Sequence, residues 1–281
     1  MTAPPRPDEG GWARQRLVVK RHGDGPALVL LPGMGAGLEV WEPLLPELGK
    51  GFRVLLVNLP GFGSPPLPAG EIADVETLTD LIEVWLHEQG LEDSHVVGHS
   101  LGGAVALELA KRGVVASVCA VAPIGFWTGS EARFAVWRLR LSAGLGRSLK
   151  RWIPLALRPR ALRTALLGQH PGPIGRRTLQ TALDVTRRLL SASAFLPILT
   201  HVQGYRFTGG ISISVPVTIA WGTRDRLLLP WQARRAGDAI PRARVVWLRR
   251  CGQLATVDDP ERVLAAIFEA ANRASGSELG A

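Results

Sequence analysis

The chain has 281 residues, of which 46% are hydrophobic and 20% charged, and its formal net charge is +9. This length suits one α/β domain that carries an insertion, and the apolar content excludes wholesale disorder. The start of the chain contains no apolar stretch, and the uncharged run at 113–130 is broken by a proline and two glycines, so we expect no signal peptide and no membrane span. Two cysteines make neither a disulfide framework nor a metal site, and we expect a soluble, cytoplasmic protein without structural metal or cofactor.

The positive charge is concentrated in one part of the chain. Residues 125–210 hold 14 Lys and Arg residues against two acidic residues, Glu131 and Asp184, which gives this segment a net charge of +12 and leaves −3 for the rest. Arginine outnumbers lysine 29 to 4, as a coding bias would produce, but such a bias does not explain why acidic residues are missing from one segment. The asymmetry indicates two compositionally distinct units.

Short apolar or β-branched segments alternate with helical patterns along most of the chain. A helix is predicted after Asp74, a candidate N-cap, and another opens after Ser100 and continues to about residue 111. A last one starts near Pro260, with Asp258 and Asp259 as candidate caps. The predicted strands show little polar–apolar alternation, as expected for strands covered on both faces; they are 17–20, 27–31, 53–58, 94–98, 116–122, 215–221 and 244–248. The alternation predicts an α/β fold with a doubly wound, mostly parallel sheet.

The basic segment interrupts this alternation between two predicted strands. We predict that residues 124–210 form a helical, Arg-rich cap over the carboxyl ends of the strands, where such sheets bind ligands. Residues 1–123 and 211–281 would form the core, with a loose tail at 1–11. Three stretches of the cap have helical character, namely 131–145, 149–167 and 174–191. Their apolar stripes are expected to pack against the protein rather than contact a ligand: Phe134, Trp137 and Leu141 in one, Trp152 and Leu155 in the next.

The clearest chemical motif is Gly98-His-Ser-Leu-Gly102, between a predicted strand and a predicted helix. Serine is a poor nucleophile unless a strained turn exposes it near hydrogen-bond donors and a base, and flanking glycines allow such a turn. In this context the G-x-S-x-G pattern predicts Ser100 as a nucleophile. A turn without chemistry is the structural alternative.

A second glycine-containing loop, Pro32-Gly-Met-Gly35, follows the strand predicted at 27–31. It predicts that the backbone N–H of Met34 pairs with that of Leu101 around a developing oxyanion. Phosphate binding is the competing interpretation, and it is disfavoured because no G-K-[ST] follows the glycines.

Together with three further segments, these motifs resemble those of the α/β-hydrolase family, in the branch with a helical cap. Residues 58–64 resemble its D-x-P-G-x-G-x-S loop with Asn in the first position, 217–225 its G-x-x-D acid loop, and 251–260 its G-H-x-x-x-x-D-x-P segment. The resemblance implies that Ser100 is the nucleophile and Asp225 the triad acid. It disfavours epoxide or haloalkane chemistry, because those branches carry a carboxylate at the nucleophile position.

Gln253 is the departure from this pattern, because the family has the catalytic histidine at that position. A neutral amide can accept a hydrogen bond from the Ser100 hydroxyl but cannot take its proton near neutral pH, so the triad lacks its general base. His170 and His201 are candidate substitutes from the cap, whereas His99 is expected to be structural. Gln253 is either an introduced, inactivating substitution or a natural feature of the protein.

Three classes of function are compatible with these residues. The first is a serine esterase, thioesterase or lactonase that acts on a hydrophobic acyl substrate. The second is a non-hydrolytic catalyst of cyclisation or acyl transfer, for example in natural-product biosynthesis, and the third is a ligand-binding protein without catalysis. The retained nucleophile, glycine loops and acid favour the first class.

Tryptophans and basic charge suggest what this protein binds. Trp127, Trp137 and Trp221 fall near the predicted cleft and are candidate substrate contacts, although filling of the core is an equally good interpretation. The charge of the cap predicts attraction of an acidic carrier protein, an acyl-CoA or an anionic membrane surface. Nucleic acid is not expected, because no recognition motif accompanies the charge.

Overall fold

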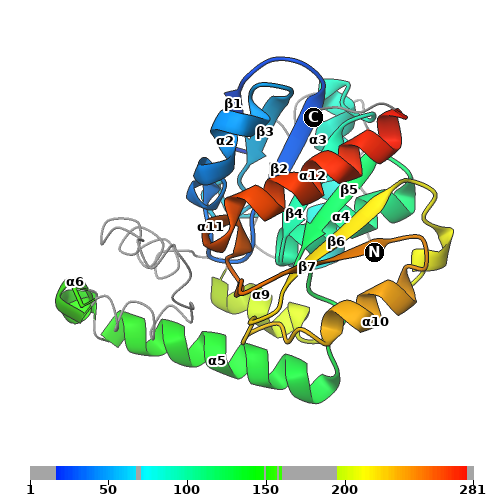
Figure 1. The fold of residues 1–281 in the computed structure, drawn as a ribbon. Helices are drawn as coiled ribbons and strands as arrows, with labels where there is room; N and C mark the ends of the chain where they lie inside the picture. Colours follow the sequence, from blue (N-terminus) through cyan, green and yellow to red (C-terminus); the bar gives the residue numbers. More distant parts are fainter. Residues whose placement is uncertain (1–16, 68–70, 149, 157, 160–194, 277–281) are drawn as a thin grey trace.

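The computed structural model describes residues 17–67, 71–148, 150–156, 158–159 and 195–276. Its centre is a seven-stranded sheet with the strand order β1-β3-β2-β4-β5-β6-β7 (Figure 1). The strands are β1 (Val19–His22), β2 (Ala27–Leu31), β3 (Arg53–Val57), β4 (His95–His99), β5 (Ser117–Val121), β6 (Val217–Gly222) and β7 (Arg244–Leu248). All neighbouring pairs are parallel except β1, which runs antiparallel to β3. The predicted mostly parallel, doubly wound sheet is confirmed.

Helices cover both faces of this sheet. One face carries α3 (Val75–Gln89), α4 (Leu101–Arg112) and α10 (Gln232–Ala239). The other carries the short helices η1 (Leu38–Val40), η2 (Glu42–Leu44), α2 (Leu45–Leu48) and α11 (Ala255–Asp258), with α12 (Pro260–Ser275) running across the face turned to the viewer (Figure 1). Accordingly β4, β5 and β6 are buried along their whole lengths, which explains why their sequences do not alternate.

Two of the three predicted helix caps are confirmed and one is wrong. The Asp74 carboxylate accepts a hydrogen bond from the backbone N–H of Thr77, and the Asp259 carboxylate accepts one from that of Arg262. Asp258 does not cap α12. Its Oδ2 accepts a hydrogen bond of 2.8 Å from the backbone N–H of Gly252, so this carboxylate instead holds the loop that leads to residue 253.

Between β5 and β6 the described residues form α5 (Gly129–Ser148), η3 (Lys150–Trp152), α6 (Ile153–Ala156), α9 (Phe195–Val202) and η4 (Gly210–Ser212). The helix predicted at 131–145 is confirmed, the next predicted stretch is helical as far as residue 156, and the stretch at 174–191 lies outside the described residues. The two ends of this insertion are bonded to each other: Phe207 N–H donates to the Gly125 carbonyl (3.1 Å), and Trp127 Nε1 donates to the Tyr205 carbonyl (3.0 Å). Within the described ranges, no helix is long and apolar enough to cross a bilayer.

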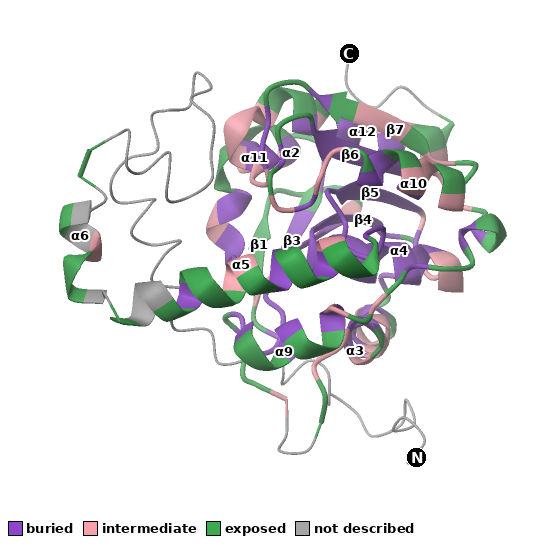
Figure 2. Cartoon of the chain, turned by 90° about the horizontal axis from the view of Figure 1, so that it is seen from below, coloured by how far each residue is buried: buried purple, intermediate pink, exposed green. Residues whose placement is uncertain are grey.

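Helix α5 has apolar residues on two opposite sides, and only one of them packs. Phe134, Trp137 and Leu141 are 44%, 58% and 45% exposed, and Trp152 and Leu155 just beyond are 51% and 55% exposed (Figure 2). The expectation that these stripes pack against the protein is therefore wrong. The side that packs is made of smaller residues, Ala132, Ala135, Val136 and Ala143, which bring the helix closer to the core.

A substitution at Gly102, in the first turn of α4, can test how closely that helix packs on the end of β2. A Cβ atom at residue 102 would lie 2.3 Å from the Leu31 carbonyl oxygen and 2.6 Å from that of Pro32, whereas one at Gly144 in α5 would meet nothing within 4 Å. We expect Gly102→Ala to lower the free energy of unfolding by about 2 kcal/mol, because it overpacks main chain against main chain. Gly144→Ala should raise it by up to about 1 kcal/mol through helix propensity.

Urea titration of both variants measures these changes. Equal small effects at the two positions would show that the start of α4 is not in close contact with the end of β2.

Candidate active site

Ser100 lies on a sharp turn between the end of β4 and the start of α4. Its backbone has φ 54° and ψ −109°, a conformation that residues with a Cβ rarely adopt. The turn is held by main-chain hydrogen bonds: Ser100 N–H donates to the Val121 carbonyl (2.9 Å), and the Ser100 carbonyl accepts from Ala104 (3.1 Å) and Ile124 (3.2 Å). The strained strand–turn–helix geometry predicted for this residue is present.

The loop after β2 lies directly against this turn. A Cβ atom on Gly33 would be 3.1 Å from Ser100 Cβ, and one on Gly98 would be only 2.1 Å from the Gly102 carbonyl oxygen. Met34 follows Gly33 and Leu101 follows Ser100 in the chain. The two residues therefore lie on segments that meet at the turn. Oxyanion binding by their N–H groups remains a prediction.

Asp225 lies in the loop after β6 and is almost completely buried, with 2% of its surface exposed. Its Oδ1 accepts hydrogen bonds from the backbone N–H groups of Leu227 (2.8 Å) and Leu228 (2.9 Å). Burial raises the pKa of this carboxyl to about 7, although the two N–H donors and the positive charge of Arg138 oppose the rise. Near neutral pH the carboxyl is therefore divided between its charged and neutral forms.

The loop with residue 253 packs against the Asp225 loop through main-chain contacts. Arg224 N–H donates to the Cys251 carbonyl (2.9 Å), and a Cβ atom on Gly222 would lie 2.5 Å from the same oxygen. No larger residue fits between the end of β6 and this loop. The Asp225 loop and the loop with residue 253 are thus neighbours.

His99 connects the same loop to the nucleophile turn. Its Nε2 lies 2.7 Å from the Gln253 carbonyl oxygen and 3.4 Å from the side-chain nitrogen of Gln253. Because a carbonyl only accepts, Nε2 carries the proton and Nδ1 does not. Burial lowers the pKa of His99 to about 4, against the opposing effect of the bond to Gln253. His99 is therefore neutral, its N–H holds the loop, and the low pKa makes its other nitrogen a weak base.

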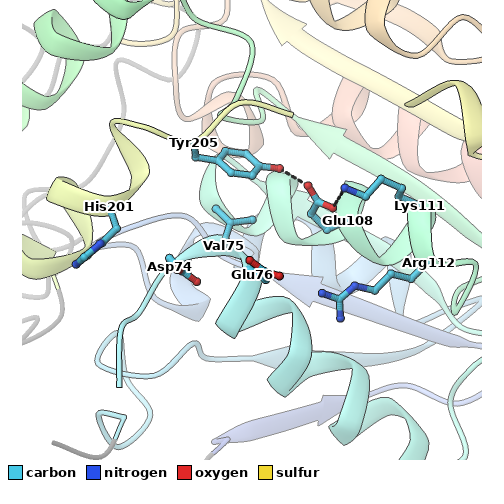
Figure 3. Close-up of a pocket in the computed structure, with 8 residues that line it drawn as sticks. All are labelled: Asp74, Val75, Glu76, Glu108, Lys111, Arg112, His201 and Tyr205. Atoms are coloured by element: carbon cyan, nitrogen blue, oxygen red, sulfur yellow. Dashed lines mark hydrogen bonds and ion pairs between the residues drawn. The ribbon is translucent and has the colours of Figure 1, made fainter. Parts of the chain in front are cut away.

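His201, a candidate substitute for the base, lies away from the Ser100 turn. His201 on α9 lines a cavity of about 510 Å³ beside α3 and α4, together with Asp74 and Tyr205, and none of the predicted catalytic residues lines it (Figure 3). In this cavity the Tyr205 hydroxyl donates to Glu108 (2.7 Å), so the buried carboxylate there is already paired. His170, the second candidate substitute, lies outside the described residues.

Of the three tryptophans predicted to contact substrate, two are buried and one is exposed. Trp127 and Trp221 are buried in the core, and their indole N–H groups donate to the carbonyls of Tyr205 and Leu228. Trp137 is 58% exposed on α5. Packing accounts for the first two positions, and substrate contact remains a prediction for all three.

The bond from His99 can be tested by His99→Ala. The substitution opens a cavity and leaves the Gln253 carbonyl without this donor, so we expect the free energy of unfolding to fall by about 3 kcal/mol. His87→Ala, at a surface position whose side chain contacts Glu92, is the control and should change it by less than about 1 kcal/mol. Denaturant unfolding distinguishes the two, and similar values for both variants would contradict the anchoring role.

Asp225→Asn tests the raised pKa through the pH dependence of stability. The folded-state pKa of about 7 exceeds the value of about 3.9 in an unfolded chain, so the folded state binds more protons between these values. The wild-type carboxyl therefore costs stability progressively as pH rises from about 4 to about 7. We expect the unfolding free energy of the variant, minus that of the wild type, to increase by a few kcal/mol between pH 5 and pH 8. A difference that stays constant would show that Asp225 titrates normally.

Among known proteins, the chain is similar to the pimeloyl-[acyl-carrier protein] methyl ester esterase of Aeromonas hydrophila, with 46% identity over 93 residues. This match spans 33% of the chain and 35% of that protein. A longer match, 28% identical over 258 residues, links 86% of the chain to 63% of the dihydrolipoyllysine-residue acetyltransferase component of the acetoin cleaving system of Cupriavidus necator. The chain thus covers less than two thirds of either relative.

Solved structures share the fold at low sequence identity. A thermophilic esterase from Thermogutta terrifontis superimposes with a TM-score of 0.68 at 21% identity, over 92% of this chain and 93% of the esterase. The model of the alpha/beta hydrolase family matches residues 28–266, which include the Ser100 turn, the Asp225 loop and Gln253. The chain belongs to the alpha/beta hydrolase family.

Proposed function

We propose that this chain is a serine-type acyl hydrolase of the esterase, thioesterase or lactonase class, with Gln253 in the position of the catalytic base. The observation that carries the proposal is the strained Ser100 turn with the Gly33 loop packed against it. A serine on such a turn, beside backbone N–H groups, is arranged for attack on an acyl carbonyl. The proposed roles are nucleophile for Ser100, oxyanion donors for Met34 and Leu101, and acid for Asp225.

The proposed reaction needs a proton acceptor that the described site does not supply. The Ser100 oxygen would bond to the acyl carbon and the carbonyl oxygen would become an oxyanion held by the two N–H groups, while solvent water takes the hydroxyl proton. Collapse of this intermediate would break the bond to the alcohol or thiol, which leaves with a proton from solvent. The Gln253 amide cannot take this proton, and His99, whose pKa burial lowers to about 4, is a weak base. Loss of the triad histidine removes on the order of 10⁶ in kcat in a serine protease, so we expect slow hydrolysis.

The residues between β5 and β6 would form the cap of this enzyme, over a core of residues 1–123 and 211–281. We propose residues 124–210 as this cap, because Arg138 on α5 reaches the loop after β6, where its guanidinium donates to the Arg226 carbonyl (2.5 Å). The proposed substrate is a hydrophobic acyl ester or thioester. A carrier-bound acyl group, as in the name of the Aeromonas relative, or an acyl-CoA would suit the +12 charge of residues 125–210.

Replacement of Gln253 by histidine tests the proposal. Its loop already packs beside the Asp225 loop and the Ser100 turn, so an imidazole at residue 253 should remove the Ser100 proton while Asp225 fixes its tautomer. We expect Gln253→His to raise kcat on a simple activated ester by several powers of ten, on the scale of triad knockouts. The gain should increase from pH 6 to pH 8, as the imidazole and Asp225 lose their protons.

Ser100→Ala in the Gln253→His background is the control and should abolish the gain. Detection of an acyl-enzyme on Ser100 by mass spectrometry would give independent support. A folded Gln253→His variant without any gain would contradict the proposed hydrolase.

Because the proposed site lacks a base, a second candidate function is a reaction that does not need one. A non-hydrolytic catalyst of cyclisation or acyl transfer needs positioning and oxyanion stabilisation but not a triad histidine, and a ligand-binding protein needs neither. Turnover that survives Ser100→Ala would favour the non-hydrolytic catalyst. Ligand binding without turnover would favour the binding protein.

A further inference from the structure

The exposed aromatic side of the insertion carries none of the proposed catalytic residues. We define the outer face as the side chains of Phe134, Trp137, Leu141, Trp152 and Leu155, which are between 44% and 58% exposed. Phe134 and Trp137 stack on each other with ring centroids 6.4 Å apart, so these two rings form one continuous apolar surface. A gathering of large apolar side chains on a protein surface marks an interaction site.

Arginines border this outer face on both sides. With 3.6 residues per turn, Arg133 and Arg140 fall on one side of the 134–137–141 stripe and Arg138 falls on the other. The guanidinium groups of Arg138 and Arg151 lie over the rings of Phe134 (5.7 Å) and Trp152 (5.3 Å). Residues 132–159 contain no Asp or Glu, so nothing in this stretch of sequence neutralises the positive charge.

We infer that the outer face binds an anionic lipid surface. An apolar stripe with aromatic residues, bordered by arginines and without acidic residues, is the pattern of a helix that lies in the headgroup region of a bilayer. The stripe runs along the exposed side of the 20-residue helix α5, and a planar lipid surface fits the outside of a helix better than a protein segment does. The aromatic rings would enter the interface while the arginines contact lipid phosphates.

The orientation of α5 gives this contact a consequence for the site. Its opposite side packs toward the loops at the carboxyl ends of the strands, and Arg138, at the edge of the outer face, is bonded to the Arg226 carbonyl next to Asp225. A protein held by the outer face would therefore keep these loops close to the lipid. The inference itself concerns binding alone and does not depend on the proposed hydrolysis.

Vesicle sedimentation with the full chain tests the inference. We expect binding to vesicles of equal parts phosphatidylcholine and phosphatidylglycerol, at least tenfold weaker binding to phosphatidylcholine alone, and weakening by salt. Trp137→Ser with Leu141→Ser should reduce binding at least tenfold. Arg133→Gln with Arg151→Gln should reduce it about 25-fold on the anionic vesicles only, from about fivefold for each arginine near a membrane surface.

The matched controls are exposed residues outside the outer face. Ile211→Ser, at a side chain that is 76% exposed, and Arg21→Gln on β1 should leave vesicle binding unchanged. Circular dichroism and thermal melting establish that all variants fold like the wild type.

Three results would overturn the inference. They are absence of wild-type binding to the mixed vesicles, equal losses in the outer-face variants and in the controls, and binding that ignores lipid charge. Calorimetric binding of an acidic acyl-carrier protein to this face, without vesicle binding, would assign the outer face to a protein partner instead. None of these measurements involves ester turnover, so they leave the proposed hydrolysis to its own test.

Discussion

The strained turn at Ser100 is the constraint on which the arrangement of the candidate site depends. A positive φ at a residue with a side chain costs on the order of 1–3 kcal/mol, and it persists only where the surroundings fix it. Here β5 and the segment after it fix the turn through Val121 and Ile124, and Gly98 and Gly102 let main chain approach main chain. The same close approach brings α4 onto the end of β2, and with it the Gly33 loop onto Ser100.

Burial dominates the electrostatics of the candidate site. Asp225 accepts hydrogen bonds from two backbone N–H groups and feels the positive charge of Arg138, but burial still raises its pKa to about 7. In a triad this carboxylate would stabilise the imidazolium that forms during the reaction, whereas an amide at residue 253 carries no charge. His99 takes no part in this balance, because burial keeps it neutral and its N–H is bonded to the Gln253 carbonyl. If Gln253 stands in the base position, as proposed, the site lacks a group there that can accept a proton near neutral pH.

The insertion between β5 and β6 has a packed side and an exposed side that differ in the size of their residues. Its ends are bonded to each other near Gly125 and Phe207, so the helices enter and leave the core at one place. Small side chains on one side of α5 pack inward, and large aromatic ones on the other side remain exposed. The charge asymmetry in the sequence separates this unit from the core, and the structure shows that the charge borders an apolar surface.

The sequence by itself determined the strands, the order of the motifs and the family, because these depend on local patterns. Unbroken apolar runs predict strands buried on both faces, and a G-x-S-x-G pattern between a strand and a helix predicts the turn at Ser100. Only the tertiary structure decided which groups meet. His99 and Gln253 are 154 residues apart in sequence, and Asp258 holds Gly252 rather than capping the helix beside it. Periodicity also identified the aromatic stripe of α5 but not its side, because both sides of that helix are apolar and only packing against the core decides which one is buried.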